Sequence, residues 1–476
     1  MVVSLLGTNL YAQWRYEHLP FTTLQEVGAA PPERLLQVIW HHQRLKRDAM
    51  QTLDGKTLQV LHPGFWNSEP GPDFRNAVIK IGGEIKTGDI ELDLTHRGWR
   101  DHGHHSNPNF RNVILHVIWS GENLPMPFPV LTLGNILDAS LPELAEWLGT
   151  EPAQGWPKEL SGNCCAPLCA LESDKLGDLL RQAALVRFQR KSKEIEFRSR
   201  QVGWTQAFWE SAFRALGYKH NTWPMQRIAE CLPALTSDAP NLLQMQARLL
   251  GISGLLPGEL PGRSGANSYV QQLWNIWWRE RESLAEFSLP KNVWKLAGIR
   301  PANHPQRRLA LAAHWLSSPD FFHRLENWFA TAKPEKELLP SLLKVLQNDK
   351  DIFWAKHWTF SSAGFETEQT LIGENRATDL AINVVLPWFW IRSVAGKNQV
   401  MQRAAENRYF EWPMAEDNSV LKLARKRLLS GNKNGLLKSA AAQQGLLQIV
   451  RDFCEHSNAI CENCRFPDLV KQIKQA

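Results

Sequence analysis

The chain has 476 residues, of which 43% are hydrophobic and 21% are charged, and its formal net charge is +6. This composition excludes a disordered or fibrous chain, and the length allows two or three domains that each bury a core. No run of about 18 uncharged apolar residues occurs, so no membrane span is expected. The first residues lack a basic segment and a cleavage site of small residues, so no signal peptide is expected. These features predict a cytoplasmic protein without a membrane partner.

The charges are distributed unevenly along the chain. Residues 1–150 contain 12 Lys and Arg against 16 Asp and Glu, so this part has a formal charge of −4 and the remainder has +10. An acidic part suits cations and a basic part suits a polyanion. A helical region with solvated Lys and Arg would have the same composition.

Helix and strand patterns alternate in the first third of the chain. A helix is expected from Pro31 onward, where the apolar residues of RLLQVIWHHQRL recur with helical spacing. Strands are expected at residues 56–64, 76–81 and 87–94, with Gly82-Gly83 as a hairpin turn. The segment THRGWRDHGHH predicts a short helix, and NVILHVIW is apolar on both faces, which is typical of a central strand. The predicted order is αβββαβ.

Helical patterns dominate beyond residue 150. A segment rich in Pro, Gly and Cys, residues 151–173, separates the two kinds of pattern. From Asp174 onward the apolar residues recur with the helical period in most segments. The sequence thus predicts an α/β domain over residues 1–150 and a larger all-α domain over residues 151–476, which ends in a Cys-rich segment.

Three acids share one face of the predicted strand GDIELDL. Asp89, Glu91 and Asp93 alternate with apolar residues, so neighbouring members lie about 7 Å apart along the strand. Asp73 stands at the mouth of the preceding strand, where antiparallel pairing can bring it beside Glu91. Carboxylates arranged in this way can share a divalent cation. The exposed face of an edge hairpin, which tolerates charge, would give the same pattern.

The order αβββαβ, with GPDF before the second strand and ELD inside the third, resembles the PD-(D/E)xK nuclease fold. The resemblance covers residues 33–119. It implies that Asp73 and Glu91 hold Mg²⁺ or Mn²⁺, and that Glu33 of the first helix is a further acid of the site.

The sequence departs from this nuclease pattern at the lysine that orients or polarises water. Asp93 occupies that position. Lys80 or Lys86 would then supply a migrated ammonium group, or Asp93 would act as a further metal ligand.

Longer stretches resemble an uncharacterised bacterial family, catalogued as domain of unknown function 2851. The resemblance is carried by VIWHHQRL, PGFWNSEPGPDF, WRDHGHH, VILHVIW, GIRPANHPQRRLALAAHWL and QQGLLQIVRDFCEHSNAICENC. These stretches run nearly end to end, and membership in the family implies no activity by itself.

Histidines gather in the same region as the acids. His102 and His104 lie in DHGHH, and His116 lies on the apolar strand, where a hydrogen-bonded core residue is expected. Imidazole binds zinc and related metals and acts as a general base near neutral pH. His102 and His104 would join Asp73 or Glu91 in a mixed N/O metal site, or replace the missing lysine. A polar helix surface is the alternative.

The cysteines are odd in number, seven, which argues against a disulfide scaffold. Cys454, Cys461 and Cys464 form the pattern C-x6-C-x2-C near the end of the chain. This resembles the beginning of the iron–sulfur loop of some DNA glycosylases, although Val470 occupies the fourth position. The pattern predicts a structural Zn²⁺ or iron–sulfur cluster that another cysteine or His456 completes. Three free cysteines are the alternative.

Two basic segments are candidates for contacts with phosphate. Arg190 and Lys191 lie in the helical segment RFQRKSKEIEFRSR. Arg300 precedes a helix that has Arg307 in its first turn, where a guanidinium opposes the helix dipole unless an anion or a carboxylate is near. Solvated helix faces and pairing with internal acids are the alternatives.

Taken together, the residues favour a metal-dependent nuclease that hydrolyses phosphodiester bonds of DNA or RNA. Asp73 and Glu91 would hold the ion, Asp93 would assist, and Lys80 or a histidine of DHGHH would position water. Two alternatives stay open. One is a non-catalytic nucleic-acid-binding or scaffold protein on a degenerate nuclease fold, and the other is a zinc hydrolase built on the histidines.

Overall fold

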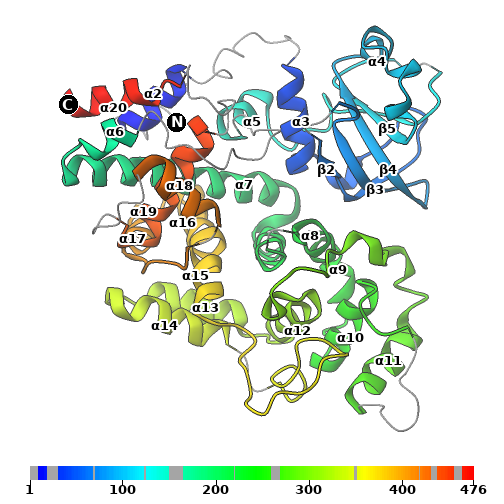
Figure 1. The fold of residues 1–476 in the computed structure, drawn as a ribbon. Coiled ribbons are helices and arrows are strands. Elements are labelled where there is room, and N and C mark those ends of the chain that lie inside the picture. The colour runs from blue at the N-terminus through cyan, green and yellow to red at the C-terminus, as the bar shows by residue number, and fades with distance from the viewer. Residues whose placement is uncertain are drawn as a thin grey trace. The chain divides into compact units, whose positions relative to one another are not determined.

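The structure of the protein is a computed structural model. It describes residues 9–18, 31–67, 70–122, 125–148, 165–218, 220–258, 268–347, 351–417, 419–429, 437–454 and 464–475. The chain forms two compact units, one from Met1–Gln201 with Lys397–Ala476 and one from Val202–Gly396 (Figure 1). A mixed sheet with helices is followed by a large helical region, which confirms the predicted fold class. The domain boundary predicted near residue 150 falls in residues 149–164, outside the described residues, and stays a prediction.

The first unit contains a mixed sheet (Figure 1). Its strands are β1 (Leu58–His62), β2 (Phe65–Trp66), β3 (Phe74–Ile81), β4 (Glu84–Asp93), β5 (Val113–Ile118) and β6 (Val130–Thr132). They follow the order β1-β3-β4-β5-β6, and β2 pairs with β3. The pairs β1–β3 and β3–β4 are antiparallel, whereas β4–β5 and β5–β6 are parallel. The crossover from β4 to β5 passes through α4 (His96–Asp101), so the predicted order αβββαβ is present, with β2 and β6 in addition.

Helices α3 (Glu33–His42) and α5 (Leu141–Leu148) cover the sheet with apolar side chains. Ile39 and Trp40 of α3 are fully buried in one core with Ile90 and Leu92 of β4. The Trp40 indole N–H donates to the carbonyl oxygen of Pro63 at 3.0 Å, which satisfies its polar atom in the core. Packing against the sheet therefore fixes α3 and brings its first turn toward β3 and β4.

Strand β4 is a central strand and not an edge. It lies between β3 and β5, and residues 88–93 are buried on both faces. The interpretation of the acids as the exposed face of an edge hairpin is therefore wrong. Gly88 is required in this position because a Cβ atom there would overlap Ile114 and the backbone of Asn112.

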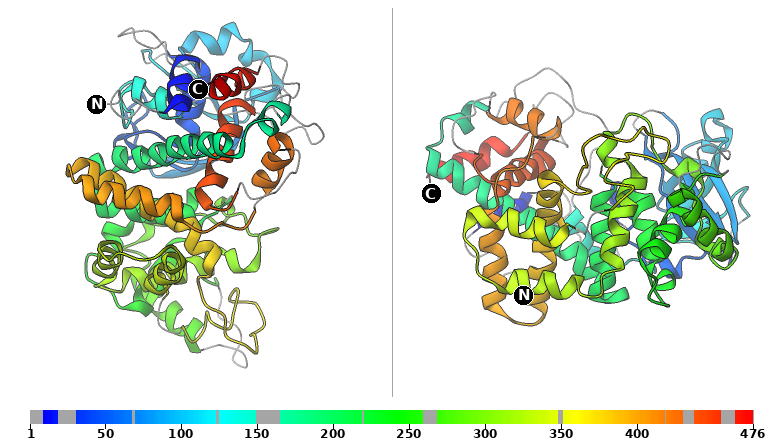
Figure 2. Two further views of the ribbon diagram at one scale, coloured as in Figure 1. Left: turned by 90° about the vertical axis from the view of Figure 1, so that its left-hand side faces the viewer. Right: turned by 90° about the horizontal axis from the view of Figure 1, so that it is seen from below.

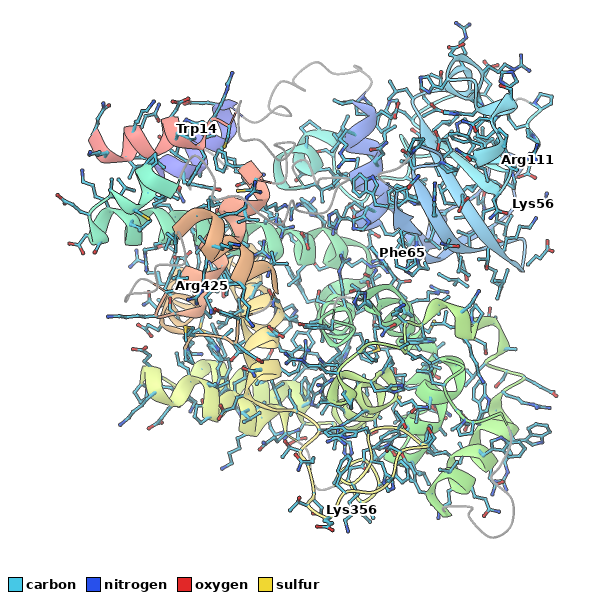
Figure 3. All side chains as sticks on the ribbon, in the orientation of Figure 1. Trp14, Lys56, Phe65, Arg111, Lys356 and Arg425 are labelled. Atoms are coloured by element: carbon cyan, nitrogen blue, oxygen red, sulfur yellow. The ribbon has the colours of Figure 1, made fainter. Side chains whose placement is uncertain are left out.

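A second core in the first unit is entirely helical. It unites α2 (Leu10–His18), α6 (Cys165–Cys169), the beginning of α7 (Ser173–Leu216), α17 (Gln399–Glu411), α18 (Ser419–Leu429), α19 (Ala440–Ile449), the π-helical turn Val450–Cys454 and α20 (Phe466–Gln475). Helices α2 and α20 lie side by side (Figure 2). Trp14, labelled in Figure 3, packs on Phe453 with 5.2 Å between ring centroids. The helical C-terminal segment thus belongs to the same unit as the sheet.

The second unit is helical. Its elements are α8 (Thr222–Glu230), α9 (Leu232–Leu235), α10 (Leu242–Ile252), α11 (Ser268–Glu280), α12 (Pro305–Leu316), α13 (Phe321–Ala330), α14 (Glu335–Leu346), α15 (Glu374–Leu380), the π-helical turn Ala381–Val385 and α16 (Leu386–Ala395). The final part of α7 follows a break at Gly203, whose φ of 81° interrupts the helix. Among the described helices, none is long and apolar enough to cross a membrane.

Candidate metal centre

Asp73 and Glu91 are joined by backbone hydrogen bonds. The N–H of Asp73 donates to Oε2 of Glu91 at 3.1 Å, and the N–H of Leu92 donates to Oδ2 of Asp73 at 3.0 Å. The register of the β3–β4 hairpin produces this exchange, because Phe74 pairs with Ile90 just beyond a bulge. The sequence-predicted neighbourhood of the two acids is therefore found in the structure.

Helix α3 adds a second side to the acidic site. The amide nitrogen of Gln37 donates to Oδ1 of Asp73 at 2.8 Å. Glu33, one helical turn earlier, is half-buried, and burial raises its pKa, with a further rise from the charge of Asp93. Sequence reasoning named Glu33 but missed Gln37. Its spacing of four residues from Glu33 places both side chains on the same helix face and was a usable signal.

The buried carboxylates repel one another. Burial raises the pKa of Glu91, and the charges of Asp73 and Asp93 raise it further. Burial also raises the pKa of Asp73, against the opposite effect of the Leu92 N–H, and the charge of Glu33 adds to the rise. Like charges in a poorly solvated place favour either protonation or a bound cation.

Three histidines approach the acids. Nε2 of His104 lies 3.0 Å from Oε1 of Glu91, and Nδ1 of His102 lies 3.2 Å from Oδ1 of Asp93. His116 is fully buried, and its Nε2 lies 2.8 Å from Oδ2 of Asp93, as expected for a hydrogen-bonded core residue. Asp89 contacts the neighbouring strand instead, because its Oδ1 accepts a hydrogen bond from the backbone N–H of Asn76 in the bulge of β3.

Asp93, His102 and His104 present their ligand atoms to a common space. One atom of each lies within 4.8 Å of the other two, and this is the group of three such side chains that the described residues contain. Oδ1 of Asp93 and Nε2 of His104 are buried, and neither makes a hydrogen bond with the described residues. Oδ1 of Asp93 lies near His102 and Nε2 of His104 lies near Glu91, but neither pair is aligned for a hydrogen bond. Buried oxygen and nitrogen atoms that make no hydrogen bond are suited to act as ligands of a metal ion.

We call the set Asp73, Glu91, Asp93, His102 and His104 the carboxylate–histidine cluster. Helix α4 closes it, because Gly98 of this helix lies directly on the carboxylate of Asp93 and a Cβ atom there would overlap it. Burial lowers the pKa of His104, while the charge of Asp93 opposes and the imidazole of His102 supports that change. A neutral imidazole is the form that binds metal ions.

The lysines proposed as substitutes for the motif lysine lie elsewhere. Lys80 is near the far end of β3, where it pairs with Gln59 and Ile85. Lys86 lies 3.6 Å from Glu84 at the opposite end of β4 from Asp93. Seven residues of extended chain separate Lys80 from Asp73, which is roughly 20 Å. The prediction that either lysine serves the acidic site is therefore wrong in this structure.

The arginines assigned to phosphate are largely used inside the protein. Arg307 is 1% exposed and donates to the carbonyl oxygens of Trp354, His357, Gln369 and Thr370. These carbonyl groups compensate the unfavourable position of its charge at the start of α12. Its predicted contact with nucleic acid is therefore wrong for this buried conformation.

The remaining predicted phosphate contacts differ in exposure. Arg190 is 6% exposed and pairs with Glu194 at 2.8 Å. Lys191 is half-buried, and its Nζ lies 3.3 Å from Oε1 of Gln444. Arg300 is exposed. The contacts of Arg190, Lys191 and Arg300 with nucleic acid stay predictions.

The cysteine prediction falls partly outside the described residues. Cys461 belongs to residues 455–463, which the structure does not describe. Cys454 and Cys464 are half-buried and pack against the helical core of the first unit. A Zn²⁺ ion or iron–sulfur cluster at these cysteines therefore stays a prediction.

The geometry defines an α/β protein in which the buried carboxylates of Glu91 and Asp93 lie beside half-buried Asp73 and His104 and exposed His102. Residues 33–419 match the family described as protein of unknown function (DUF2851), and the chain belongs to that family. The match contains the whole carboxylate–histidine cluster, together with Glu33 and Gln37. Among curated proteins and solved structures, none matches the chain.

Proposed function

We propose that the protein is a metal-dependent nuclease whose centre is the carboxylate–histidine cluster. The observation that carries the proposal is the pair of orphaned buried atoms, Asp93 Oδ1 and His104 Nε2, beside the linked carboxylates of Asp73 and Glu91. Like charges and unused ligand atoms at one buried place are costly in free energy unless a cation is held there.

The donor set indicates which cation fits. Asp93, His102 and His104 offer one oxygen and two nitrogen atoms, a combination that suits Mn²⁺, Fe²⁺ or Zn²⁺. Asp73 and Glu91 offer oxygen atoms alone, which suit Mg²⁺ or Mn²⁺. Mn²⁺ is compatible with both sets, so it is the first ion to test. When bound, a divalent cation would supply positive charge to a phosphate and promote ionisation of water.

The topology supports phosphodiester chemistry by analogy. The antiparallel strands β1, β3 and β4, the crossover helix α4 and the parallel strand β5 follow the order of the PD-(D/E)xK nucleases that the sequence resembles. Asp73 and Glu91 occupy the positions of the metal-binding acids in that pattern. Where the pattern has lysine, this chain has Asp93 with His102 and His104 around it, so imidazoles replace the ammonium group.

We assign to Glu33 the role of the general base, which accepts the proton of the attacking water. Glu33 is half-buried, and its raised pKa makes it a better base near neutral pH than an ordinary glutamate. In hydrolysis the oxygen of water bonds to phosphorus, the proton of that water passes to Glu33, and the bond from phosphorus to the leaving sugar oxygen breaks. The leaving oxygen takes a proton from solvent.

A second candidate follows from the two histidines. A zinc hydrolase acting on a small phosphoester would use the same atoms of Asp93, His102 and His104, and it needs no long substrate. Hydrolysis of bis(p-nitrophenyl) phosphate without cleavage of any oligonucleotide would favour this candidate.

The test is cleavage of labelled single- and double-stranded DNA and RNA with Mg²⁺, Mn²⁺ or Zn²⁺. Wild type is compared with Glu91→Gln, His104→Gln and the control Glu84→Gln, which changes an exposed acid at the other end of the same strand. Metal binding is measured separately by calorimetry. We expect metal-dependent cleavage that only Glu91→Gln and His104→Gln abolish, with at least tenfold weaker metal binding. Metal binding without cleavage of any substrate would overturn the nuclease in favour of a binding protein.

A further inference from the structure

A pocket with a volume of about 400 Å³ lies beside the carboxylate–histidine cluster, and its lining contains aromatic and basic side chains. It lies between α4, the 3₁₀ turn Pro108–Phe110 and residues 125–128. Its apolar wall contains Trp99, Phe110, Met126 and Phe128. This volume falls within the range of about 300–1,000 Å³ that is usual for sites of small organic groups.

The aromatic wall is a packed structure. The rings of Trp99 and Phe128 meet edge to face at 4.5 Å between centroids, and those of Trp99 and Phe110 meet at 5.8 Å. Trp99 and Phe110 are buried, whereas Phe128 and Met126 are half-buried. The two half-buried side chains therefore offer apolar surface to a ligand, and the two buried rings hold them in place.

His104 connects this pocket with the carboxylate–histidine cluster. Its ring stacks on Phe110 with 4.0 Å between centroids, and its Nε2 lies 3.0 Å from Oε1 of Glu91. The same imidazole also lines the pocket. A group that enters the pocket is thus separated from the cluster by the width of one ring.

Two arginines give the pocket its charge. Arg100 and Arg111 line it, both are exposed, and neither guanidinium group makes a hydrogen bond or an ion pair with the described residues. Figure 3 labels Arg111 on the segment that leads into β5. An aromatic wall with two available guanidinium groups fits a planar aromatic ligand that carries phosphate.

We infer that this pocket receives one unpaired base of a nucleic acid strand, while Arg100 and Arg111 contact the flanking phosphates. The inference rests on the proposed function and specifies its substrate as a single strand or an unpaired end. A base inside a duplex is stacked and paired and has to leave the helix before it can enter such a pocket. Stacking on aromatic side chains tolerates any base, so the pocket selects strandedness rather than sequence.

The test measures equilibrium binding of the full chain to a fluorescein-labelled single strand in EDTA, for both DNA and RNA. The single strand is expected to bind at least tenfold more tightly than the blunt duplex of the same sequence. Phe128→Ala and, as a second variant that removes less of the packed wall, Met126→Ala are expected to weaken binding by roughly 5- to 100-fold. Circular dichroism verifies that each variant is folded.

Substitution of single positions by an abasic nucleotide locates the bound base. One position is expected to weaken binding to wild type and to have little effect on Phe128→Ala or Met126→Ala, since the two changes remove the same contact. If no position behaves in this way, or if the duplex binds as tightly as the single strand, the inference is overturned.

Arg97 is the control for the two arginines of the pocket, and it lies on the same helix as Arg100. Arg100→Ala and Arg111→Ala are each expected to weaken binding. Each is also expected to reduce the slope of the logarithm of affinity against the logarithm of salt concentration by about one. Arg97→Ala changes an exposed arginine of α4 that does not line the pocket and is expected to bind as wild type. Equal effects of all three would contradict the pocket. If the wild-type protein cleaves single strands and duplexes equally well, the base-binding pocket is refuted and the nuclease is retained. If the protein binds single strands as predicted but cleaves no substrate, the nuclease is refuted and the pocket is retained.

Discussion

The N–H of Asp73 donates a hydrogen bond of 3.1 Å to the carboxylate of Glu91, eighteen residues further along the chain. This bond holds two acidic residues together where burial raises the pKa of both carboxyl groups, and the charge of Asp73 raises the pKa of Glu91 further. The fold thereby maintains an arrangement that is unfavourable in the absence of a cation. Such an arrangement is expected where function, rather than stability, determines the residues.

Glu91→Gln is expected to raise the thermal stability of the metal-free protein at neutral pH. The raised pKa of Glu91 means that folding requires either a buried charge beside Asp73 and Asp93 or the uptake of a proton, and glutamine requires neither. The same change is expected to abolish stabilisation by Mn²⁺. In wild type, an ion at one hundred times its Kd contributes about 2.7 kcal/mol. Differential scanning calorimetry with EDTA and with Mn²⁺ measures both effects.

Glu84→Gln is the control for this prediction. It changes an exposed acid of the same strand, and both its stability and its response to Mn²⁺ are expected to equal those of wild type. A Glu91→Gln variant that is less stable than wild type in EDTA would show that the carboxylate contributes to the fold more than its charge costs.

Glu33→Gln is expected to lower kcat by about 10²- to 10⁴-fold and to leave the affinity for Mn²⁺ within a few-fold of wild type. The residue is assigned to proton transfer, which contributes rate enhancements of this size. Single-turnover cleavage and calorimetry separate the two quantities. A fall in metal affinity that accounts for the lost rate would instead identify Glu33 as a metal ligand.

Gly98→Ala is expected to weaken both Mn²⁺ binding and stability, since the added methyl group overlaps the carboxylate of Asp93. Steric overlap in a packed place typically costs about 1–3 kcal/mol. Gly177→Ala is a matched control in another helix, where a Cβ atom meets nothing within 4 Å. There the change is expected to stabilise the protein by about 0.5–1 kcal/mol. Equal melting temperatures for the two variants would contradict the contact between α4 and Asp93.

Periodicity was sufficient to predict the local order of the α/β region. The alternation in GDIELDL placed Asp89, Glu91 and Asp93 on one face, and Gly82-Gly83 marked the hairpin that the structure contains. The same pattern did not reveal that β4 is central, because that position depends on its pairing with β5 beyond α4. Burial of β4 also depends on contacts with α3, which precedes it by about 50 residues, and with α4.

The composition of the site was harder to predict than its position. Gly98 has no chemical signature of its own, and Gln37 is marked only by the helix face that it shares with Glu33. The contacts of these residues with Asp93 and Asp73 are formed in the tertiary structure. Lys80 was a candidate because Asp93 occupies the position of the motif lysine and a migrated ammonium group was expected. In an extended strand, however, seven residues correspond to most of the height of the sheet.

Arg307→Met is expected to destabilise the second unit by at least about 3 kcal/mol and to leave binding of nucleic acid unchanged. The guanidinium is buried and donates to several carbonyl oxygens, and each of these would lose a partner inside the protein. Hydrogen exchange of residues 202–396, followed by mass spectrometry, reports the loss in that unit. The exposed Arg279 provides the control, since Arg279→Ala is expected to change stability by no more than about 0.5 kcal/mol. Weaker binding of a single strand by folded Arg307→Met would restore the role in phosphate recognition.

Asp351 makes the stability of the second unit dependent on pH in the acid range. Burial alone would raise its pKa, but hydrogen bonds from His314 and the backbone N–H of Trp354 reverse this and lower the pKa below its usual value. Because the unfolded chain binds the proton more readily, Asp351 stabilises the folded unit fully above pH about 4, the ordinary pKa of aspartate. That stabilisation is lost as the pH falls through the lower pKa of the folded state.

Asp351→Asn is therefore expected to destabilise the second unit at pH 7 and to make less difference at pH 3, where the carboxylate of wild type becomes protonated. The measurement is hydrogen exchange of residues 202–396 in both proteins at the two pH values, corrected for the intrinsic rates of exchange. Glu282→Gln is the control, because Glu282 is exposed and its side chain makes no hydrogen bond or ion pair with the described residues. If the difference between Asp351→Asn and wild type were equal at both pH values, the loss would come from packing or from the geometry of the hydrogen bonds, and not from the charge of Asp351.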